Sequence, residues 1–377
     1  MIISTLNESD KDTRVAISPA AVKQYIKMGF EVTVETQAGN ASGFSDADYQ
    51  QAGATVVNER TVLLKTTNIV LLVNEPNPSE LDGLQAHSLV IAHIDNEPQA
   101  ELITWACKEN ISLISMNLIP RISRAQSMDS LSSQANLAGY RAVLEATAYF
   151  KRAIPMMMTA AGMIHPAKVL VLGAGVAGLQ AIATAKRLGA VVYAFDVRRA
   201  AKEQVESLGA EFVEVGVEQD AETKGGYASE TSEEYKRQQA ELIDKFARQS
   251  DIVISTALIP GRKAPILLTK QTVEGMKPGS IIVDLATSRG GNCEYSERDK
   301  VVRIGGVTVV GYSNLAGFVP ATASELYATN LLNLMRLLAP KAEQLDFNAE
   351  DEIIKQALLC HAGKYLPFQA NKEAQHA

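Results

Sequence analysis

Three glycines are the residues in this sequence whose spacing points most clearly to chemistry. Gly173, Gly175 and Gly178 follow an apolar run in the order GxGxxG and open a helix-like stretch. In such a loop the first glycine permits a tight turn, the second lets the backbone approach a pyrophosphate, and the third allows close helix packing. The amides of this loop, which includes Ala174 and Val176, would face the phosphates. The spacing predicts a dinucleotide site, and the alternative is a turn without ligand.

An aspartate at the end of the next predicted strand indicates which dinucleotide binds. Asp196 lies 18 residues after Gly178. A carboxylate there accepts both hydroxyls of the adenine ribose and repels a 2′-phosphate, which favours NAD over NADP. The residues that follow are Val197, Arg198 and Arg199. An arginine can accommodate that phosphate, but the position of Asp196 is the more diagnostic feature.

A second polar cluster, in residues 120–134, precedes a long predicted helix. Arg121 offers a fork of donors for a carboxamide, phosphate or carboxylate. Asp129 could accept from a nicotinamide amide, and Gln126 and Ser132 can both donate and accept. Because Asp129 and Ser132 also suit a helix start, capping is an equally good explanation of these two.

Two further segments are candidate parts of a site. Residues 256–261 follow a predicted strand that ends at Ser255, and ligands lie at the carboxyl ends of such strands. Leu258 could therefore pack against a cofactor, or it could serve only loop packing. Residues 218–235 are polar and contain Gly225-Gly226, which is typical of a mobile surface loop; an insertion without function is the alternative.

The elements around these segments alternate between strands and helices in two runs. Ser18 and Pro19 predict a helix start, and that helix ends near Gly29. The strands of the first run are predicted at 30–35, 69–73, 89–93 and 111–115, and a second helix is predicted at 99–109. The second run has strands at 167–172, 191–195, 251–255, 280–284 and 308–310, with helices at 178–188 and 200–208.

Long predicted helices at 131–148 and 325–338 flank the second run, so the chain is expected to return to its first domain. The predicted fold class is α/β, with two Rossmann-like domains that have parallel sheets, the second inserted in the first, and a cleft between them. The predicted domains are 1–130 with 325–377, an N-terminal α/β domain, and 131–324, the NAD-binding domain.

Composition narrows the class of protein. The 377 residues are 46% apolar and 21% charged, with a net charge of -7, which argues against nucleic-acid binding. The widely spaced Cys107, Cys293 and Cys360 indicate neither a metal site nor a redox pair, and fit a reducing cytoplasm. Charged residues near the start exclude a signal-peptide core, and no apolar run reaches the ~20 residues of a membrane helix.

Several segments resemble one known family. Residues 119–143, 154–162, 202–210, 256–261 and 290–293 closely resemble the NAD(H)-binding component of proton-translocating NAD(P) transhydrogenases, within the alanine dehydrogenase/transhydrogenase superfamily. The match runs from about Arg14 to Asn333. Residues 311–318 in part and 346–377 depart from it, so contacts made there are less well predicted.

The resemblance implies roles for particular residues. Those expected at the nicotinamide half of NAD(H) are Arg121, Gln126, Ser127, Met128, Asp129 and Ser132. Asp196 and Arg198 would lie at the adenosine ribose. The remaining residues expected around the nucleotide are Gly225, Gly226 and Tyr227 of a mobile loop, together with Gln239 and Leu258.

The resemblance also implies partners and a reaction. The family's component is a homodimer that docks an NADP(H)-binding domain carried by a membrane-embedded partner, at the cytoplasmic face of the inner membrane. Hydride passes directly from NADH to NADP+ on the partner. Transfer between two cofactors needs positioning and desolvation and no acid or base on this chain. We expect Gln126 near the point where the two nicotinamides meet.

Two other functions remain open. Alanine dehydrogenase shares the fold, and Arg14 and His93 fall where its substrate-binding arginine and catalytic histidine would be. However, residues 71–76 lack its lysine, and Ser288 stands where its catalytic aspartate is expected. We therefore expect His93 to be a buried, satisfied histidine and Arg14 to be structural. A regulatory module that only senses NAD is the second alternative.

Overall fold

The computed structural model describes residues 1–97, 100–215, 232–258 and 263–366. The chain divides into two compact units. Unit 1 comprises Met1–Gln134 and Gly317–Ala377, and unit 2 comprises Ala135–Ala316. Helix α5 (Ser130–Tyr149) begins in unit 1 and ends in unit 2. The units are described one at a time below.

Unit 1 is built on an eight-stranded sheet with the order β17-β16-β6-β5-β4-β1-β2-β3. The first six strands of the chain pair in parallel, whereas β16 pairs antiparallel with β6 and with β17. The strands are β1 (Ile2–Thr5), β2 (Glu31–Glu35), β3 (Thr55–Val57), β4 (Ile69–Asn74), β5 (Leu89–His93), β6 (Ser112–Ser115), β16 (Leu358–His361) and β17 (Lys364–Tyr365).

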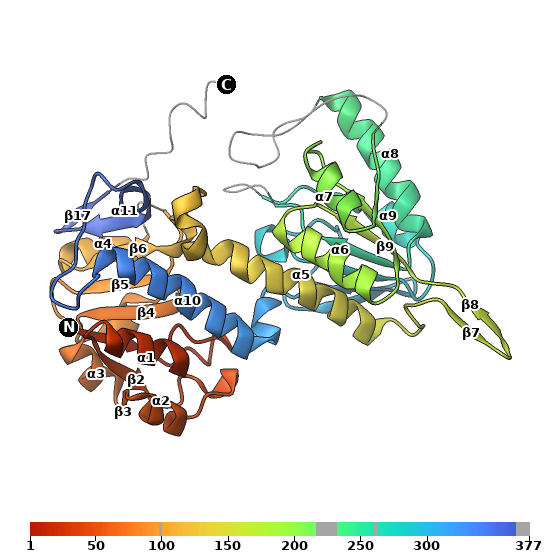
Figure 1. Ribbon diagram of the computed structural model, residues 1–377. Coiled ribbons are helices and arrows are strands. Elements are labelled where there is room, and N and C mark those ends of the chain that lie inside the picture. The colour runs from red at the N-terminus through yellow and green to blue at the C-terminus, as the bar shows by residue number, and fades with distance from the viewer. Residues whose placement is uncertain (98–99, 216–231, 259–262, 367–377) are drawn as a thin grey trace. The chain divides into compact units, whose positions relative to one another are not determined.

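Helices cover both faces of this sheet (Figure 1). Strand β4 shows the two faces, because Ile69, Leu71 and Val73 join one apolar cluster and Val70 and Leu72 the other. The first cluster packs against α1 (Pro19–Lys27), α2 (Asp46–Ala52), α10 (Pro320–Leu338) and α11 (Glu352–Ala357). The second packs against α3 (Arg60–Thr66) and α4 (Glu101–Lys108). Short 3-10 turns are η1 (Asn40–Ser42), η2 (Pro78–Leu81), η3 (Met116–Leu118) and η4 (Ser123–Met128).

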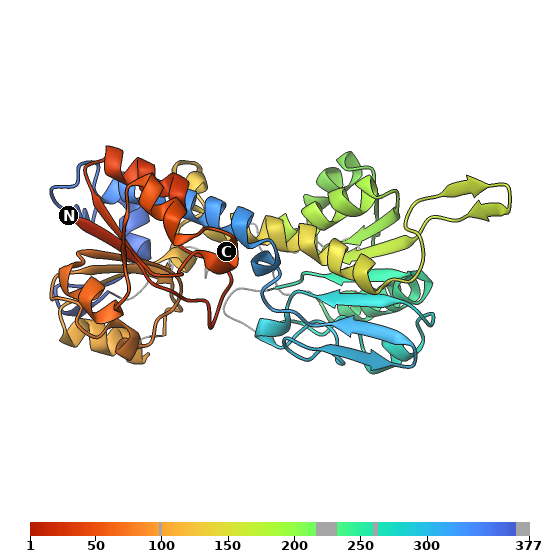
Figure 2. The ribbon, with the colours of Figure 1, turned by 90° about the horizontal axis from the view of Figure 1, so that it is seen from below.

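Unit 2 contains a seven-stranded sheet with the order β11-β10-β9-β12-β13-β15-β14, seen from below in Figure 2. All pairs are parallel except β14 with β15. The strands are β9 (Lys168–Leu172), β10 (Val191–Phe195), β11 (Glu211–Phe212), β12 (Ile252–Ser255), β13 (Ile281–Asp284), β14 (Val301–Ile304) and β15 (Val307–Val310). The helices are α6 (Val176–Arg187), α7 (Ala201–Ser207), α8 (Glu233–Gln249) and α9 (Lys270–Glu274), and 3-10 turns lie at η5 (Thr287–Arg289) and η6 (Ala316–Phe318).

Each sheet reverses its strand order at its first strand. In unit 1, β1 lies between β2 and β4, and in unit 2, β9 lies between β10 and β12. This is the topological switch point at which open α/β sheets bind ligands. The predicted α/β class, with two Rossmann-like sheets that are mostly parallel, is confirmed.

The structure departs from the sequence predictions at several elements. The antiparallel strands β14, β16 and β17 and the hairpin of β7 (Met157–Thr159) and β8 (Gly162–Ile164) were not predicted. The predicted loop 218–235 lies outside the described residues up to 231. The prediction of a loop is wrong for residues 233–235, which are helical. The Ser232 side chain accepts a hydrogen bond from Tyr235 N and caps the start of α8. Among the described residues, the helices are all too short or too polar to cross a membrane.

Candidate functional site

The glycine loop of unit 2 lies at the switch point of its sheet. The chain leaves β9 at Leu172 and enters α6 at Val176. Gly173 adopts a φ of +94°, a left-handed conformation that favours glycine, and its N–H donates to Phe195 O at 2.8 Å. A Cβ on Gly178 would stand 1.8 Å from Gly173 O. Two of the three glycines are therefore required by the turn and by helix packing, as the motif predicts.

Gly175, the N-cap of α6, has a different environment. Apart from Gly175 and its two chain neighbours, no heavy atom of the described residues lies within 4 Å of the position that a Cβ on Gly175 would take. The amides of the first helical turn have no acceptor within the helix, and the helix N-terminus carries partial positive charge. Val176 is exposed and Ala174 is buried beside them. The first turn of α6 thus offers open space and amide donors, the combination that a pyrophosphate requires. The expectation that the Ala174 amide faces the phosphates is wrong in this structure, because that amide donates to Asp196 and the Gly173 amide donates to Phe195 O.

Asp196 follows β10 and lies beside this loop. Its Oδ2 accepts from Ala174 N at 2.7 Å, so the carboxylate is tied to the glycine loop. The Arg198 guanidinium donates from Nε to Oδ1 at 2.9 Å and from Nη2 to Oδ2 at 2.8 Å, and Arg198 N donates to Oδ1 at 2.8 Å. Four donors fill the roughly four acceptor positions of a carboxylate. A ribose could bind Asp196 only by displacing the Arg198 side chain; Val197 lies half-buried between them.

The polar cluster before α5 belongs to unit 1. Asp129 accepts from Ser132 N at 2.9 Å and from the Ser132 hydroxyl, so these two residues cap the start of α5. The Ser127 carbonyl accepts from Asn330 Nδ2 at 2.9 Å, which ties η4 to α10. Met128 is buried in the apolar core. This segment of the cluster therefore has a structural role at least, as its composition suggested.

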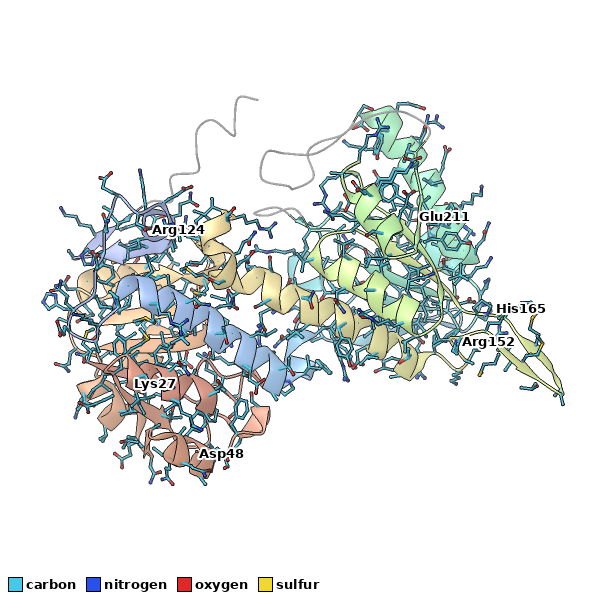
Figure 3. The ribbon with its side chains drawn as sticks, in the orientation of Figure 1. Lys27, Asp48, Arg124, Arg152, His165 and Glu211 are labelled. Carbon is cyan, nitrogen blue, oxygen red and sulfur yellow. The ribbon has the colours of Figure 1, made fainter. Side chains whose placement is uncertain are left out.

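Several members of the cluster have side chains at the surface. Arg121 and Gln126 are exposed, on either side of the first turn of η4. Neighbouring Arg124, labelled in Figure 3, forms a bidentate ion pair with Asp351, with Nη1 2.6 Å from Oδ2. That pair fixes the segment against α11, and Gln126 remains available to meet a ligand or a partner.

The other predicted site residues lie in unit 2. Leu258, after β12, is 44% exposed, and Gln239 lies half-buried on α8. Gly226 and Tyr227, with Gly225, lie outside the described residues. The predicted site residues thus fall into two groups, one in each unit, and within unit 2 a hydrogen bond joins Asp196 to the glycine loop.

Sequence reasoning missed Asn292, which holds the loop after β12. Its side chain is buried; Oδ1 accepts from Ser255 Oγ at 2.8 Å and from Ala257 N at 3.1 Å. Its Nδ2 donates to Ala257 O at 2.9 Å and to Pro265 O at 2.8 Å. Asn292 thereby positions the backbone that carries Leu258. The stretch 290–293 was singled out by the resemblance alone, and nothing in its composition indicates this role.

Arg14 of unit 1 is already paired. Its Nε and Nη2 contact the two oxygens of Asp12 at 3.0 and 2.7 Å, and Nη1 donates to Gln134 Oε1 at 2.9 Å. Asp12 Oδ2 also accepts from Asn74 Nδ2 at 3.3 Å. Asn74 belongs to the segment 71–76, which has no lysine. The prediction of a structural Arg14 agrees with these contacts.

His93, at the end of β5, is also satisfied. Its Nδ1 lies 2.6 Å from Asn117 Oδ1, and its ring stacks on Tyr327 with centroids 5.1 Å apart. Burial lowers the pKa of His93 to about 4, with Asn117 opposing this effect. The ring is therefore neutral near pH 7. Ser288, in unit 2, occupies a 3-10 turn and supplies no carboxylate.

Comparison with known proteins gives consistent matches over nearly the whole chain. Residues 5–138 match the family described as alanine dehydrogenase/PNT, N-terminal domain, and residues 142–367 match its C-terminal domain. A Rhodospirillum rubrum protein, named as the first portion of NAD(P) transhydrogenase subunit alpha, is 48% identical over 93% of this chain and 94% of that one.

Two solved structures extend this likeness. A transhydrogenase from Sinorhizobium meliloti is 47% identical, with a TM-score of 0.88 over 97% of this chain and 100% of that one. An L-alanine dehydrogenase is 27% identical, with a TM-score of 0.80 over 97% of each chain.

Proposed function

The chain belongs to the alanine dehydrogenase/PNT family, and from this premise we propose that it is the NAD(H)-binding subunit of a proton-translocating transhydrogenase. In this proposal, NADH on this chain gives hydride directly to NADP+ held on another chain. The observation that carries it is the open glycine loop beside Asp196, in a chain 48% identical to a relative named for transhydrogenase subunit alpha.

The residues present fit NAD(H). The space beside Gly175 and the first-turn amides of α6 suit the pyrophosphate. Asp196 would accept the adenine-ribose hydroxyls once Arg198 releases it, and a 2′-phosphate there would meet a carboxylate. Bound NADH would supply the hydride.

The exposed residues of η4 would serve the nicotinamide end. Gln126 can donate and accept, so it suits the orientation of a neutral carboxamide or of a ring presented to a partner. Arg121 and Asp129 would complete that contact, with Asp129 also retaining its role as helix cap. The residues of this chain thus position and desolvate the cofactor, and none of them needs to transfer a proton.

An alanine dehydrogenase activity has less support. Such an enzyme needs a carboxylate anchor and a proton-transfer group. Arg14 is held by Asp12 and Gln134, and His93 is neutral and bonded to Asn117. Ser288 offers no carboxylate.

We further propose that the subunit works as a homodimer with a membrane-embedded partner and an NADP(H)-binding partner. The hairpin β7–β8 supports the dimer. It extends from the body of unit 2 in Figure 1, and Met156, Met158 and Met163, on or next to it, are 61%, 79% and 50% exposed. Arg152 and His165, labelled in Figure 3, flank this apolar arm. Clustered exposed apolar side chains are typical of an interface, and the occupant that we propose is a second copy of the chain.

The decisive experiment mixes the NADH-loaded chain with an NADP(H)-binding partner domain loaded with a spectrally distinct NADP+ analogue. Rapid hydride exchange in the absence of added substrate is the expected result. Oxidation of NADH by pyruvate and ammonia without the partner would instead establish an alanine dehydrogenase. NADH binding without either reaction would leave the NAD-sensing module as the function.

A variant sharpens the role of Gln126. Gln126→Asn keeps the amide but shortens its reach, so transfer should slow by roughly 10-fold while NADH affinity stays nearly constant. Stopped-flow transfer rates and equilibrium titration with NADH separate the two effects. Arg124→Lys, on the neighbouring structural ion pair, is the matched control. A large loss of affinity in Gln126→Asn would contradict a positioning role at the transfer point.

A further inference from the structure

Two cysteines that are 253 positions apart in the sequence meet in unit 1. Cys107 lies in the last turn of α4 and Cys360 on β16, and their sulfur atoms are 2.9 Å apart. Both are free thiols. The spacing of cysteines in the sequence indicates no redox pair, whereas the structure brings these two thiols together. The sequence gives no sign of the pair because the pairing of β16 with β6 alone brings the C-terminal segment to α4.

We propose that Cys107 and Cys360 form a modification site, at which a small-molecule disulfide of the glutathione type converts the two thiols into one intramolecular disulfide. This site is independent of the glycine loop and of any nucleotide. The third cysteine, Cys293, lies buried in unit 2 and takes no part in it.

The two thiols differ in ways that assign their order of reaction. Cys107 is half-buried, so a dissolved disulfide can reach it, whereas Cys360 is fully buried. Burial raises the pKa of the Cys360 thiol, and the adjacent Cys107 raises it further. Because the thiolate is the nucleophile, the accessible Cys107 attacks first.

The exchange balances in two steps. Cys107, after losing its proton to water, attacks one sulfur of the small disulfide, forms a mixed disulfide and expels one small thiolate. Cys360 then loses its proton to that thiolate, attacks the Cys107 sulfur and expels the second small thiolate. Two protein thiols are oxidised to one disulfide, and one small disulfide is reduced to two thiols.

The surrounding backbone keeps the pair adjacent. The turn between β16 and β17 packs on the end of α4, since a Cβ on Gly363 would lie 3.4 Å from Cys107 O. Gly363 has a φ of +73°, which favours glycine in that turn. The hairpin is closed by Leu366 N donating to Leu359 O at 2.8 Å, and Tyr365 OH donates to Asn96 Oδ1 at 2.8 Å. Both sulfurs are thus presented by elements with defined positions.

The disulfide would restrain the unfolded chain strongly. It would close a loop from residue 107 to residue 360, which contains the whole of unit 2. Cross-links that close long loops stabilise most, because they remove the most freedom from the unfolded state. The oxidised protein should therefore hold the β16–β17 hairpin on unit 1 more firmly than the reduced protein.

The test treats the folded full-length chain with oxidised glutathione at neutral pH. The free thiols should fall from three to one, with a mass lower by two hydrogen atoms and a proteolytic peptide that joins Cys107 to Cys360. Cys107→Ser and Cys360→Ala should each abolish the link, and Cys293→Ala should leave it intact. Three thiols remaining, a link to Cys293 or to a second chain, or a lasting glutathione adduct on Cys107 would each overturn the proposal.

Thermal unfolding gives a second readout. Trp105, the single tryptophan, lies in α4 two positions from Cys107 and reports on unit 1. Its fluorescence transition should rise by about 5 °C or more on oxidation and return on reduction with dithiothreitol. An unchanged transition in a protein shown to carry the link would refute the stabilising role. None of these measurements uses NADH, so they stand or fall separately from the proposed function.

Discussion

The two units share a strand order but differ at the point where that order reverses. In unit 2 the chain after β9 turns through glycines, and the space beside Gly175 is open. In unit 1 the turn after β1 has no glycine and carries Glu8. The Glu8 oxygens accept from Val73 N at 2.8 Å and from Asn74 N at 2.9 Å, at the end of the adjacent strand β4. The same switch point thus has open space in unit 2 and is occupied by the Glu8 side chain in unit 1.

The comparison teaches that local side chains, and not the fold, decide which switch point has open space for a ligand. A buried carboxyl group at the unit 1 position fills the switch point and occupies the backbone donors at the end of β4. Asp12 and Arg14 lie in the same loop as a bonded pair. Unit 1 therefore uses these polar residues in contacts with one another and with Gln134 and Asn74 of the same unit.

The largest effect is expected from closing the open switch point. Gly175→Val should leave the fold intact, because no described atom contacts the position of the added Cβ and the φ of -77° suits any residue. The side chain would occupy the space where the backbone must approach the pyrophosphate. We expect NADH binding to weaken at least ~1000-fold, or ~4 kcal/mol, by fluorescence titration.

Gly178→Ala is the control for this prediction. Its Cβ would stand 1.8 Å from Gly173 O, so this variant should lower the thermal transition as well as NADH binding. If Gly175→Val bound NADH with unchanged affinity while folded, the pyrophosphate would not lie at this loop, and the contrast between the units would lose its functional meaning.

The elements that sequence could predict are those specified by local patterns. Strands β5 and β10 lie at the predicted bounds, because each is a short apolar run that ends at or just before a polar residue, His93 in β5 and Asp196 after β10. The turn at Gly173 follows from the requirement for positive φ. Capping by Asp129 was one of two explanations from composition, and its bonds to Ser132 support it.

The features that sequence could not predict depend on contacts between distant residues. Strand β16 forms because β6 offers a free sheet edge more than 200 positions away, and its own four residues carry no pattern of alternation. The sequence around Asn292 is that of an ordinary loop, and its role depends on four side-chain hydrogen bonds to Ser255, Ala257 and Pro265. The ion pair between Arg198 and Asp196 likewise depends on side-chain geometry that the sequence pattern does not specify.

The second prediction concerns the filled switch point and its dependence on pH. Burial raises the pKa of Glu8 from 4.5 to about 7, opposed by its bonds from Val73 and Asn74 and assisted by Asp12. A carboxyl group whose pKa is higher in the folded than in the unfolded state contributes most to folding stability at pH values below its unfolded pKa. For Glu8 this contribution is lost as the pH rises from 4.5 through about 7. The change is ~3 kcal/mol at most.

His93 acts in the opposite direction over nearly the same range. Its pKa is about 4 when folded and 6.5 when unfolded, so its effect favours folding increasingly as pH rises from 4 to 6.5. Asp12, Arg14 and Asp95 are the charged groups that face it. The two slopes largely cancel in the natural chain. Glu8→Gln should therefore reveal a free energy of unfolding that rises with pH.

Urea unfolding followed by Trp105 fluorescence checks this from pH 4 to 8, because Trp105 reports on unit 1. His93→Gln, which keeps a donor for Asn117, should show the reverse slope, with stability falling as pH rises. Equal and flat pH profiles in both variants would mean that Glu8 is ionised in the folded state near pH 5, contrary to the picture of a filled, desolvated switch point.

The smallest effect is expected within the open site, from the competition between Arg198 and a ribose for Asp196. Asp196→Ala should weaken NADH binding by about 10-fold and relax discrimination against NADPH, because the carboxylate that repels a 2′-phosphate is lost.

Arg198→Ala should act oppositely on selectivity, because it removes a cation that could face that phosphate and frees Asp196 from its ion pair. Titrations of both variants with NADH and NADPH measure the ratio of the two affinities. Since both variants remove one partner of the same ion pair, a merely structural role for the pair would give equal losses for both nucleotides in both variants. Opposite shifts in the ratio would mean that Asp196 reads the adenosine ribose and that Arg198 holds its place until a nucleotide arrives.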